Sequence, residues 1–182
     1  LLRRMNFILH IVSSLSPLIF FFGGILFSVV TKKNFGYYFA IYLTIFGDLF
    51  NRFLKIIFTN IFSESEWIKR PDPDAPCNFF LNNPAHQSGG FPSGHAQTIS
   101  LGTTLGLSYL WHFSTENITK QIIITIFSCL FVLYVCWSRI SLGCHNIYQI
   151  IAGIIIGIIF GLYGYYLFVN FANLDNLMNK GS

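Results

Sequence analysis

The chain has 182 residues, of which 53% are hydrophobic, 18% aromatic and only 10% charged. Soluble domains carry about 25% charged residues, so this composition excludes an ordinary soluble domain and an intrinsically disordered chain. The formal charge of +4 comes from dispersed basic residues, and no segment offers the basic face with exposed aromatics that nucleic-acid binding needs. We therefore expect a membrane protein with one domain, residues 1–182, and no nucleic-acid partner.

Uncharged or nearly uncharged runs long enough to cross a bilayer recur along the chain. The hydrocarbon core is about 30 Å thick, and a helix needs roughly 20 apolar residues to cross it. Five such spans are predicted, at residues 7–30, 36–58, 94–113, 121–137 and 146–171. These runs are far longer than the strands of a membrane β-barrel. The expected fold class is all-α, a polytopic membrane helical bundle with about five transmembrane helices.

One long connection, residues 61–93, separates the second and third spans and holds four of the seven acidic residues. A long loop in a compact domain is commonly functional. Five spans place the N-terminus and this loop on one side of the membrane, and Lys32, Lys33 and Lys120 on the other. The positive-inside rule weakly favours the lysine side as cytoplasmic, although two arginines near the N-terminus count against it. The loop would then face the lumen or another extracytoplasmic compartment.

Three Asp, Glu, Lys or Arg residues lie inside a span: Asp48, Arg52 and Lys55, all near the end of the second one. Asp48 and Arg52 are four residues apart, so the simplest interpretation is an ion pair along the helix. Lys55 favours a functional interpretation, because a charge inside a membrane is costly and other cations lie on the same side.

Arginines and histidines gather at the ends of the spans on this same side. Together with two small residues at a helix start, the candidate set comprises Arg70, Ser93, Gly94, His95, Arg139 and His145. The planar fork of arginine donors suits a phosphate group, and a helix N-terminus adds backbone N–H groups. No acidic cluster suggests Mg²⁺ and no His/Cys spacing suggests zinc, so we expect a phosphate site without a metal or other cofactor. One histidine can attack phosphorus while the other protonates the leaving oxygen.

The segments Pro92-Ser93-Gly94-His95 and Ser138-Arg139-x5-His145, with Arg70-Pro71 upstream, resemble the signature motifs of the type 2 phosphatidic acid phosphatase superfamily. The resemblance runs from Lys55 to Gln149. It implies that His145 is the nucleophile and His95 the general acid, that Arg70 and Arg139 bind the phosphate, and that Ser93 and Gly94 contribute donors. It also implies metal-independent hydrolysis through a phosphohistidine, at a site facing the lumen, the periplasm or the outside.

The first motif departs from the family pattern of a Lys, six residues and then Arg-Pro, because that spacing falls on Ser63. We interpret the longer distance from Lys55 to Arg70 as an insertion in the loop, with Lys55 keeping the role of the motif lysine. Lys69, adjacent to Arg70, is the alternative.

Gln149 stands where most family members place an Asp, four residues after the nucleophile. Residues four apart share a helix face, so Gln149 could accept the Nδ1–H of His145 and fix its tautomer. An amide contact between helices is the alternative. Glutamine at this place resembles the glucose-6-phosphatase and dolichyl diphosphatase branches of the family.

The expected function is an integral membrane phosphatase acting on a lipid phosphate or diphosphate, either phosphatidate-like or a polyprenyl diphosphate. One alternative is a lipid phosphotransferase of the same fold, in which the phosphohistidine is discharged onto an acceptor lipid. Another is a non-catalytic lipid-binding relative, which predicts Lys55 far from Arg70 and Arg139. Whether Cys77 and Cys144, both on the site's side, form a disulfide is left open by the sequence.

Overall fold

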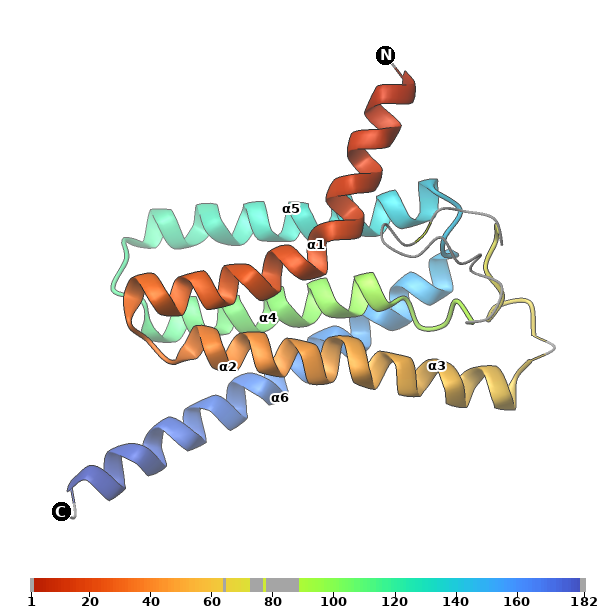
Figure 1. Ribbon diagram of the computed structural model, residues 1–182. Helices are drawn as coiled ribbons and strands as arrows, with labels where there is room; N and C mark the ends of the chain where they lie inside the picture. Colours follow the sequence, from red (N-terminus) through yellow and green to blue (C-terminus); the bar gives the residue numbers. More distant parts are fainter. Residues whose placement is uncertain (1, 64, 73–76, 78–88, 181–182) are drawn as a thin grey trace.

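The computed structural model describes residues 2–63, 65–72, 77 and 89–180, with side chains described from residue 11 to residue 171 within these ranges. The predicted loop therefore lies partly outside the described residues. The described elements are all helical: α1 (Leu2–Thr31), α2 (Phe35–Tyr42), the π-helical segment η1 (Leu43–Leu49), α3 (Phe50–Ile61), α4 (Gly94–Phe113), α5 (Ile118–Ser141) and α6 (Ile147–Lys180). Since α2, η1 and α3 follow one another without a break, five rods form the helical bundle of Figure 1, and the predicted fold class is confirmed.

The observed helices are as long as the predicted spans or longer. α4 has the predicted bounds, whereas α1, α5 and α6 continue beyond the apolar runs. Hydropathy marks the part of a helix that suits the hydrocarbon core, but the helix can continue into polar sequence. At the start of α5, Asn117 Oδ1 accepts a hydrogen bond from the Thr119 N–H at 2.8 Å, and this cap adds a turn that hydropathy does not reveal.

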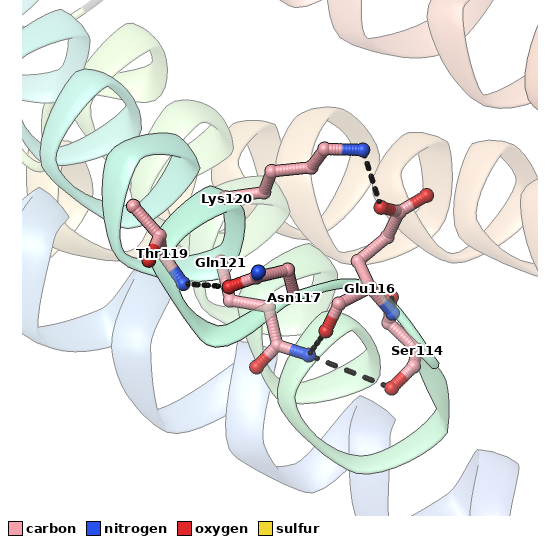
Figure 2. A network of polar contacts seen from close by, with 6 residues as sticks. All are labelled: Ser114, Glu116, Asn117, Thr119, Lys120 and Gln121. Atoms are coloured by element: carbon pink, nitrogen blue, oxygen red, sulfur yellow. Dashed lines mark hydrogen bonds and ion pairs between the residues drawn. The ribbon is translucent and has the colours of Figure 1, made fainter.

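The turn before α5 closes on itself through a small polar network (Figure 2). Lys120 Nζ lies 3.0 Å from Glu116 Oε2, and Gln121 Nε2 lies 3.1 Å from the Glu116 carbonyl and 3.5 Å from that of Ser114. All of these groups come from one short stretch of chain. The network therefore fixes the connection between α4 and α5 locally.

Three helical segments are long and apolar enough to cross a membrane: Ile11–Thr31, Ile118–Ser141 and Ile147–Phe171. The α2–α3 rod and α4 are more polar because they carry buried polar side chains, among them Asn51, Gln97 and Thr98. These side chains face the other rod: Asn51 Nδ2 donates to Gln97 Oε1 at 2.8 Å. The two rods with the lowest hydropathy are thus the ones that place polar groups inside the bundle.

The π-helical segment η1 is tied to α4 by side chains of α4. Gln97 Nε2 donates to the Phe46 carbonyl at 2.7 Å, and Thr98 Oγ1 donates to the Gly47 carbonyl at 3.1 Å. The irregular backbone therefore has defined partners inside the protein. π-Helical turns occur frequently near functional sites, and this one lies in the helix that leads to Lys55.

α6 packs closely against α4 along a stripe of glycines. A Cβ added at Gly153 would lie 2.6 Å from the Ser93 carbonyl oxygen, and one added at Gly161 would lie 2.6 Å from Thr104 Cβ. Only a glycine allows this approach, which brings the start of α6 beside the start of α4.

α1 is bent, and Figure 1 shows its N-terminal part turned away from the bundle. Pro17 lies inside this helix and has no N–H to donate to the carbonyl of Ser13. The hydroxyl of Ser16 donates to that carbonyl instead, at 2.7 Å. The bend thus has an identifiable cause and a compensating hydrogen bond.

Candidate active site

Helix ends and one loop bring the predicted cations and histidines together at one end of the bundle. Lys55 comes from α3, Arg70 from the loop after it, and Arg139 from the last turn of α5. The charges of all three act on both His95, in the first turn of α4, and His145, just before α6. The structure therefore places these five side chains within electrostatic reach of one another.

His145 is held in a defined orientation by Gln149. His145 Nδ1 lies 3.0 Å from Gln149 Oε1, and both side chains are buried. Gln149 Nε2 donates to the carbonyls of Trp67 and Lys69, at 2.9 and 2.8 Å. Because the amide nitrogen points to carbonyls, the amide oxygen faces His145, and Nδ1 of the ring carries the proton. The Nε2 atom of His145 then has the free lone pair that a nucleophile needs.

The electrostatic surroundings keep His145 neutral. Burial lowers its pKa well below the ordinary value of 6.5, and the positive charges of Lys55 and Arg70 lower it further. The hydrogen bond with Gln149 acts in the opposite direction but does not outweigh them. At neutral pH the ring is therefore an uncharged imidazole.

Arg139 is fully buried and is held by groups from three parts of the chain. Its Nη2 donates to the Cys77 carbonyl at 2.6 Å and lies 3.2 Å from Cys144 Sγ. Its Nη1 lies 3.4 Å from the hydroxyl oxygens of both Ser13 and Ser14. These contacts fix the guanidinium plane, and within the described part of the chain its Nε has no hydrogen-bond partner.

Arg70 has a similar incomplete set of partners. Its Nη1 donates to the Cys144 carbonyl at 3.2 Å, whereas its buried Nε has no partner among the described residues. Burial lowers the pKa of Arg70 from 12.5, but a guanidinium stays charged at physiological pH. A buried donor without a partner costs about 1–3 kcal/mol. Oxygen atoms of a bound phosphate would satisfy the two free Nε–H groups.

No carboxylate within the described ranges forms an ion pair with Lys55, Arg70 or Arg139. By contrast, Lys69 lies at the surface, with its Nζ 2.8 Å from Glu66 Oε1. The charges of Lys55 and both arginines, Arg70 and Arg139, act on one another. The geometry favours Lys55 as the motif lysine. The non-catalytic alternative predicts Lys55 far from Arg70 and Arg139, and the structure does not match that prediction.

The predicted ion pair between Asp48 and Arg52 is present. Arg52 Nη2 lies 3.0 Å from Asp48 Oδ2, and both side chains are exposed on the outer surface of the rod. This pair is separate from the cluster formed by Lys55, Arg70 and Arg139.

Ser93 and Gly94 have structural contacts that the sequence did not predict. Ser93 is the N-cap of α4, its Oγ accepting from the Ala96 N–H at 3.4 Å, and its own N–H donates to the Gln149 carbonyl at 3.0 Å. The Ser93 N–H is therefore not free for a phosphate. A Cβ on Gly94 would lie 2.8 Å from Asn51 Oδ1, so the glycine permits close packing against α3.

A disulfide joins Cys77 of the long loop to Cys144, the residue before His145, with a Cα–Cα distance of 5.6 Å. The sequence left this pairing open because nothing in it fixes the distance between the loop and the turn. Both carbonyls of the pair accept hydrogen bonds from arginines of the site. The disulfide therefore helps to build the arginine cluster.

Several residues around the site were missed from the sequence. Ser13 and Ser14 contact Arg139, and Asn51 and Gln97 form a buried amide pair below the start of α4. Their common signal is a polar side chain inside an otherwise apolar span, which must find a partner in the protein.

A family model described as the PAP2 superfamily matches residues 36–172. The chain belongs to this superfamily. The resemblance of the motifs is therefore confirmed, and the match extends beyond them on both sides. Among the described residues, no group of three His, Cys, Asp or Glu side chains is placed to hold a metal ion. The expectation of a metal-free reaction remains a prediction.

A curated relative is the "Dolichyldiphosphatase" of Saccharomyces cerevisiae (strain ATCC 204508 / S288c), which is 29% identical over 117 residues. The matched stretch covers 64% of this chain and 46% of the yeast protein, so the chain spans about half of that relative. No solved structure matches the chain significantly.

Proposed function

We propose that this PAP2 protein is an integral membrane phosphatase that hydrolyses a lipid phosphate or diphosphate through a phosphohistidine on His145, without a metal. One observation carries the proposal: a neutral, oriented imidazole lies beside three cations that have no carboxylate partner in the described structure. Such an arrangement suits a group that brings its own negative charge. A phosphoryl group in transfer spreads that charge over three equatorial oxygens.

In the first step, the lone pair of His145 Nε2 forms a bond to phosphorus while the bond from phosphorus to the leaving oxygen breaks. The leaving oxygen takes a proton from His95. The Nδ1–H of His145 stays bonded to Gln149 Oε1, which fixes the ring as it becomes positively charged. Lys55, Arg70 and Arg139 stabilise the equatorial oxygens.

In the second step, water attacks the phosphohistidine. His95, which gave up a proton in the first step, takes a proton from that water, the bond between phosphorus and Nε2 breaks, and inorganic phosphate leaves. The side chain of His95 thus returns to its starting state.

The substrate that we favour is a polyprenyl diphosphate, with a phosphatidate-like lipid as the other candidate. The yeast relative named "Dolichyldiphosphatase" supports the first, together with the glutamine that replaces the usual aspartate after the nucleophile. A lipid can reach the site from the bilayer because the helix ends that form the site lie at one end of the bundle.

We propose that all five rods cross the membrane and that the site faces the lumen or another extracytoplasmic compartment. The disulfide between Cys77 and Cys144 supports this orientation, because disulfides persist in oxidising compartments. The lysines at the opposite end of the bundle support it as well.

The test is phosphate release from a polyprenyl diphosphate, phosphatidate and glucose 6-phosphate in detergent with excess EDTA. Wild type is compared with His145→Ala, and with Lys120→Ala at the opposite end as the matched control. We expect release that persists in EDTA, is retained in the control and falls by at least about 10³-fold in His145→Ala.

Equal release by wild type and His145→Ala, with both proteins folded, would contradict the proposed mechanism. Substrate turnover that requires an added acceptor lipid, and that yields the phosphorylated acceptor in place of inorganic phosphate, would favour the phosphotransferase. No release from any substrate would favour the non-catalytic relative.

A further inference from the structure

We propose that Asn146 is a positioning residue of the active site, because it holds the amide of Gln149 against the proposed nucleophile, His145. It also ties the start of α6 to the loop segment that precedes Arg70. The inference rests on the proposed function in one respect, the assignment of His145 as the nucleophile. Asn146 acts through these neighbours and not on the substrate.

Asn146 and Gln149 form a reciprocal pair of hydrogen bonds at the start of α6. Asn146 Oδ1 accepts from the Gln149 N–H at 3.0 Å, and Gln149 Oε1 accepts from the Asn146 N–H at 3.3 Å. The Asn146 carbonyl accepts a helical hydrogen bond from the Ile150 N–H at 3.2 Å. This is the capping-box arrangement, in which the cap and the third helical residue satisfy each other's N–H groups. The side chain that faces His145 is therefore part of the cap of α6.

The backbone N–H of Asn146 determines which way round the amide of Gln149 lies. A backbone N–H can only donate, so it selects the oxygen of that amide and not the nitrogen. The same oxygen lies 3.0 Å from Nδ1 of His145. An acceptor at this place requires a proton on Nδ1 and leaves the lone pair of Nε2 free. The cap of α6 thus determines the tautomer of His145.

The side chain of Asn146 also reaches the loop before Arg70. Its Nδ2 donates to the Trp67 carbonyl at 3.2 Å, and the same carbonyl accepts from Gln149 Nε2 at 2.9 Å. Gln149 Nε2 also donates to the carbonyl of Lys69, the residue before Arg70, at 2.8 Å. Aspartate and serine cap helices as well as asparagine does, but neither has an amide N–H to donate. The contact with Trp67 therefore distinguishes Asn146 from a residue that only caps a helix.

The amide of Gln149 has no room for solvent around it. Gln149 is fully buried, and a Cβ added at Gly90 would lie 2.5 Å from its Oε1 and 2.7 Å from its Nε2. The Gly90 N–H donates to the carbonyl of Ile68, in the same loop segment, at 2.7 Å. Water cannot easily replace a partner that is lost here, so removal of Asn146 should be felt at the amide and at His145.

Asn117 provides the matched control at the other end of the bundle. It is the N-cap of α5, and its Oδ1 accepts from the Thr119 N–H at 2.8 Å. Asn117→Ala and Asn146→Ala each remove an asparagine cap from one helix, and both should lower stability. Only Asn146 lies beside the proposed nucleophile, so only its loss should change the site.

The first experiment reads the tautomer of His145 and does not depend on activity. In protein labelled with ¹⁵N-histidine, a single tautomer gives separate signals for the two ring nitrogens, whereas exchange between tautomers averages them. We expect separate signals, with the proton on Nδ1, in wild type and in Asn117→Ala, assigned by their loss in His145→Ala. In Asn146→Ala the two signals should move toward each other. In a Gln149→Leu background, Asn146→Ala should cause no further change.

The second experiment separates the cap from the contact with the loop. Asn146→Ser keeps an oxygen that can cap α6 but is too short to reach the Trp67 carbonyl. We expect it to keep the separate His145 signals and a kcat within about threefold of wild type. Its KM for phosphatidate should rise by about threefold or more, and so should the concentration of inorganic phosphate that raises Tm, because Arg70 is held less firmly. Asn146→Ala should also lower kcat about tenfold.

Identical His145 signals in wild type and Asn146→Ala, with both proteins folded, would overturn the proposal, as would an equal change in Asn117→Ala. A wild-type KM and phosphate response in Asn146→Ser would make Asn146 a helix cap only, and would also overturn it. If Asn146→Ala does not fold, the phosphate response of Asn146→Ser decides alone. A failure of the proposed function shows separately, as an absence of phosphate release by wild type while the His145 signals change as expected.

Discussion

Two loops at opposite ends of the bundle are each held by a glutamine amide, but the two amides reach very different distances along the chain. Gln121, at the start of α5, donates to carbonyls of Ser114 and Glu116 in the turn directly before its own helix (Figure 2). Gln149, at the start of α6, donates to the carbonyl of Lys69, 80 residues earlier. The first contact closes a turn, whereas the second joins a distant loop to a histidine.

The charges at the two ends differ in the same way. Lys120 pairs with Glu116 within one turn of chain, and both side chains are exposed. Lys55, Arg70 and Arg139 come from separate elements and repel one another. An ion pair between residues close in sequence stabilises the local fold. Cations brought together from distant parts of the chain cost folding free energy, and they suit the binding of an anion.

The largest expected difference between the two ends is in activity after loss of a lysine. Lys55→Met should lower kcat by about 10²–10³-fold, because one donor to the transferring phosphoryl group is lost. It should also raise the free energy of unfolding by about 1 kcal/mol, since repulsion among the cations is relieved. Lys120→Met should keep full activity and change stability by less than about 0.5 kcal/mol. Phosphate release measures the activity of the two variants, and thermal unfolding measures their stability. A fully active Lys55→Met would show that this cation does not serve the reaction.

The two glutamines give the next comparison. Gln149→Leu should lower kcat by up to about 10²-fold, because the His145 tautomer is no longer fixed and the loop with Arg70 is released. Gln121→Leu should destabilise the protein by about 1 kcal/mol and leave kcat unchanged. Steady-state kinetics and chemical unfolding separate the two effects. Loss of kcat in Gln121→Leu comparable with that in Gln149→Leu would mean that the two ends are not functionally distinct.

Loss of the disulfide should have a smaller effect. Cys77→Ser or reduction of the wild type should lower activity about tenfold, because the Cys77 carbonyl then no longer holds Arg139 in place. Cys129, a free and exposed cysteine, provides the control as Cys129→Ser. Activity is measured with and without dithiothreitol, and an unaltered rate in the reduced protein would exclude a role for the disulfide in the site.

The smallest expected effect is on pH dependence. Because the pKa of His145 is lowered, the acid limb of kcat/KM should lie below pH 6.5. Removing a positive charge in Lys55→Met should move that limb to higher pH, while Lys120→Met should leave it in place. Stability should also fall as the pH drops below 6.5, since His145 binds a proton more readily in the unfolded chain. An acid limb at or above 6.5 in the wild type would contradict the lowered pKa.

The sequence predicted the rods well, because long apolar runs leave few alternatives to membrane helices. The bounds of α4 were right since Ser93 and Ser114 end an apolar run at both sides. The extension of α5 was missed because it depends on a side-chain cap at Asn117. η1 was missed because a π-helical turn has no hydropathy signal that differs from that of an α-helix.

Within the site, the helix-end residues could be placed from the sequence because their spans fix the side of the membrane on which they lie. The partners of Gln149 in the loop could not, since they are backbone carbonyls and any sequence offers those. The disulfide required the path of the long loop, which neither composition nor periodicity determines. Ser13 and Ser14 were missed because nothing in the sequence shows that this part of α1 lies beside Arg139.

The π-helical segment η1 has a consequence for how this protein can change by insertion and deletion. A π-turn accommodates an additional residue within a helix, and each residue of a helix rotates the following side chains by about 100°. Deleting one residue from Leu43–Leu49 would therefore restore a regular α-helix and leave Lys55 facing Arg70 and Arg139. The same deletion in the regular helix that follows, between Phe50 and Lys55, would turn the lysine away from the site. The π-helical segment is thus the one place in this rod where a residue can be lost without disconnecting Lys55.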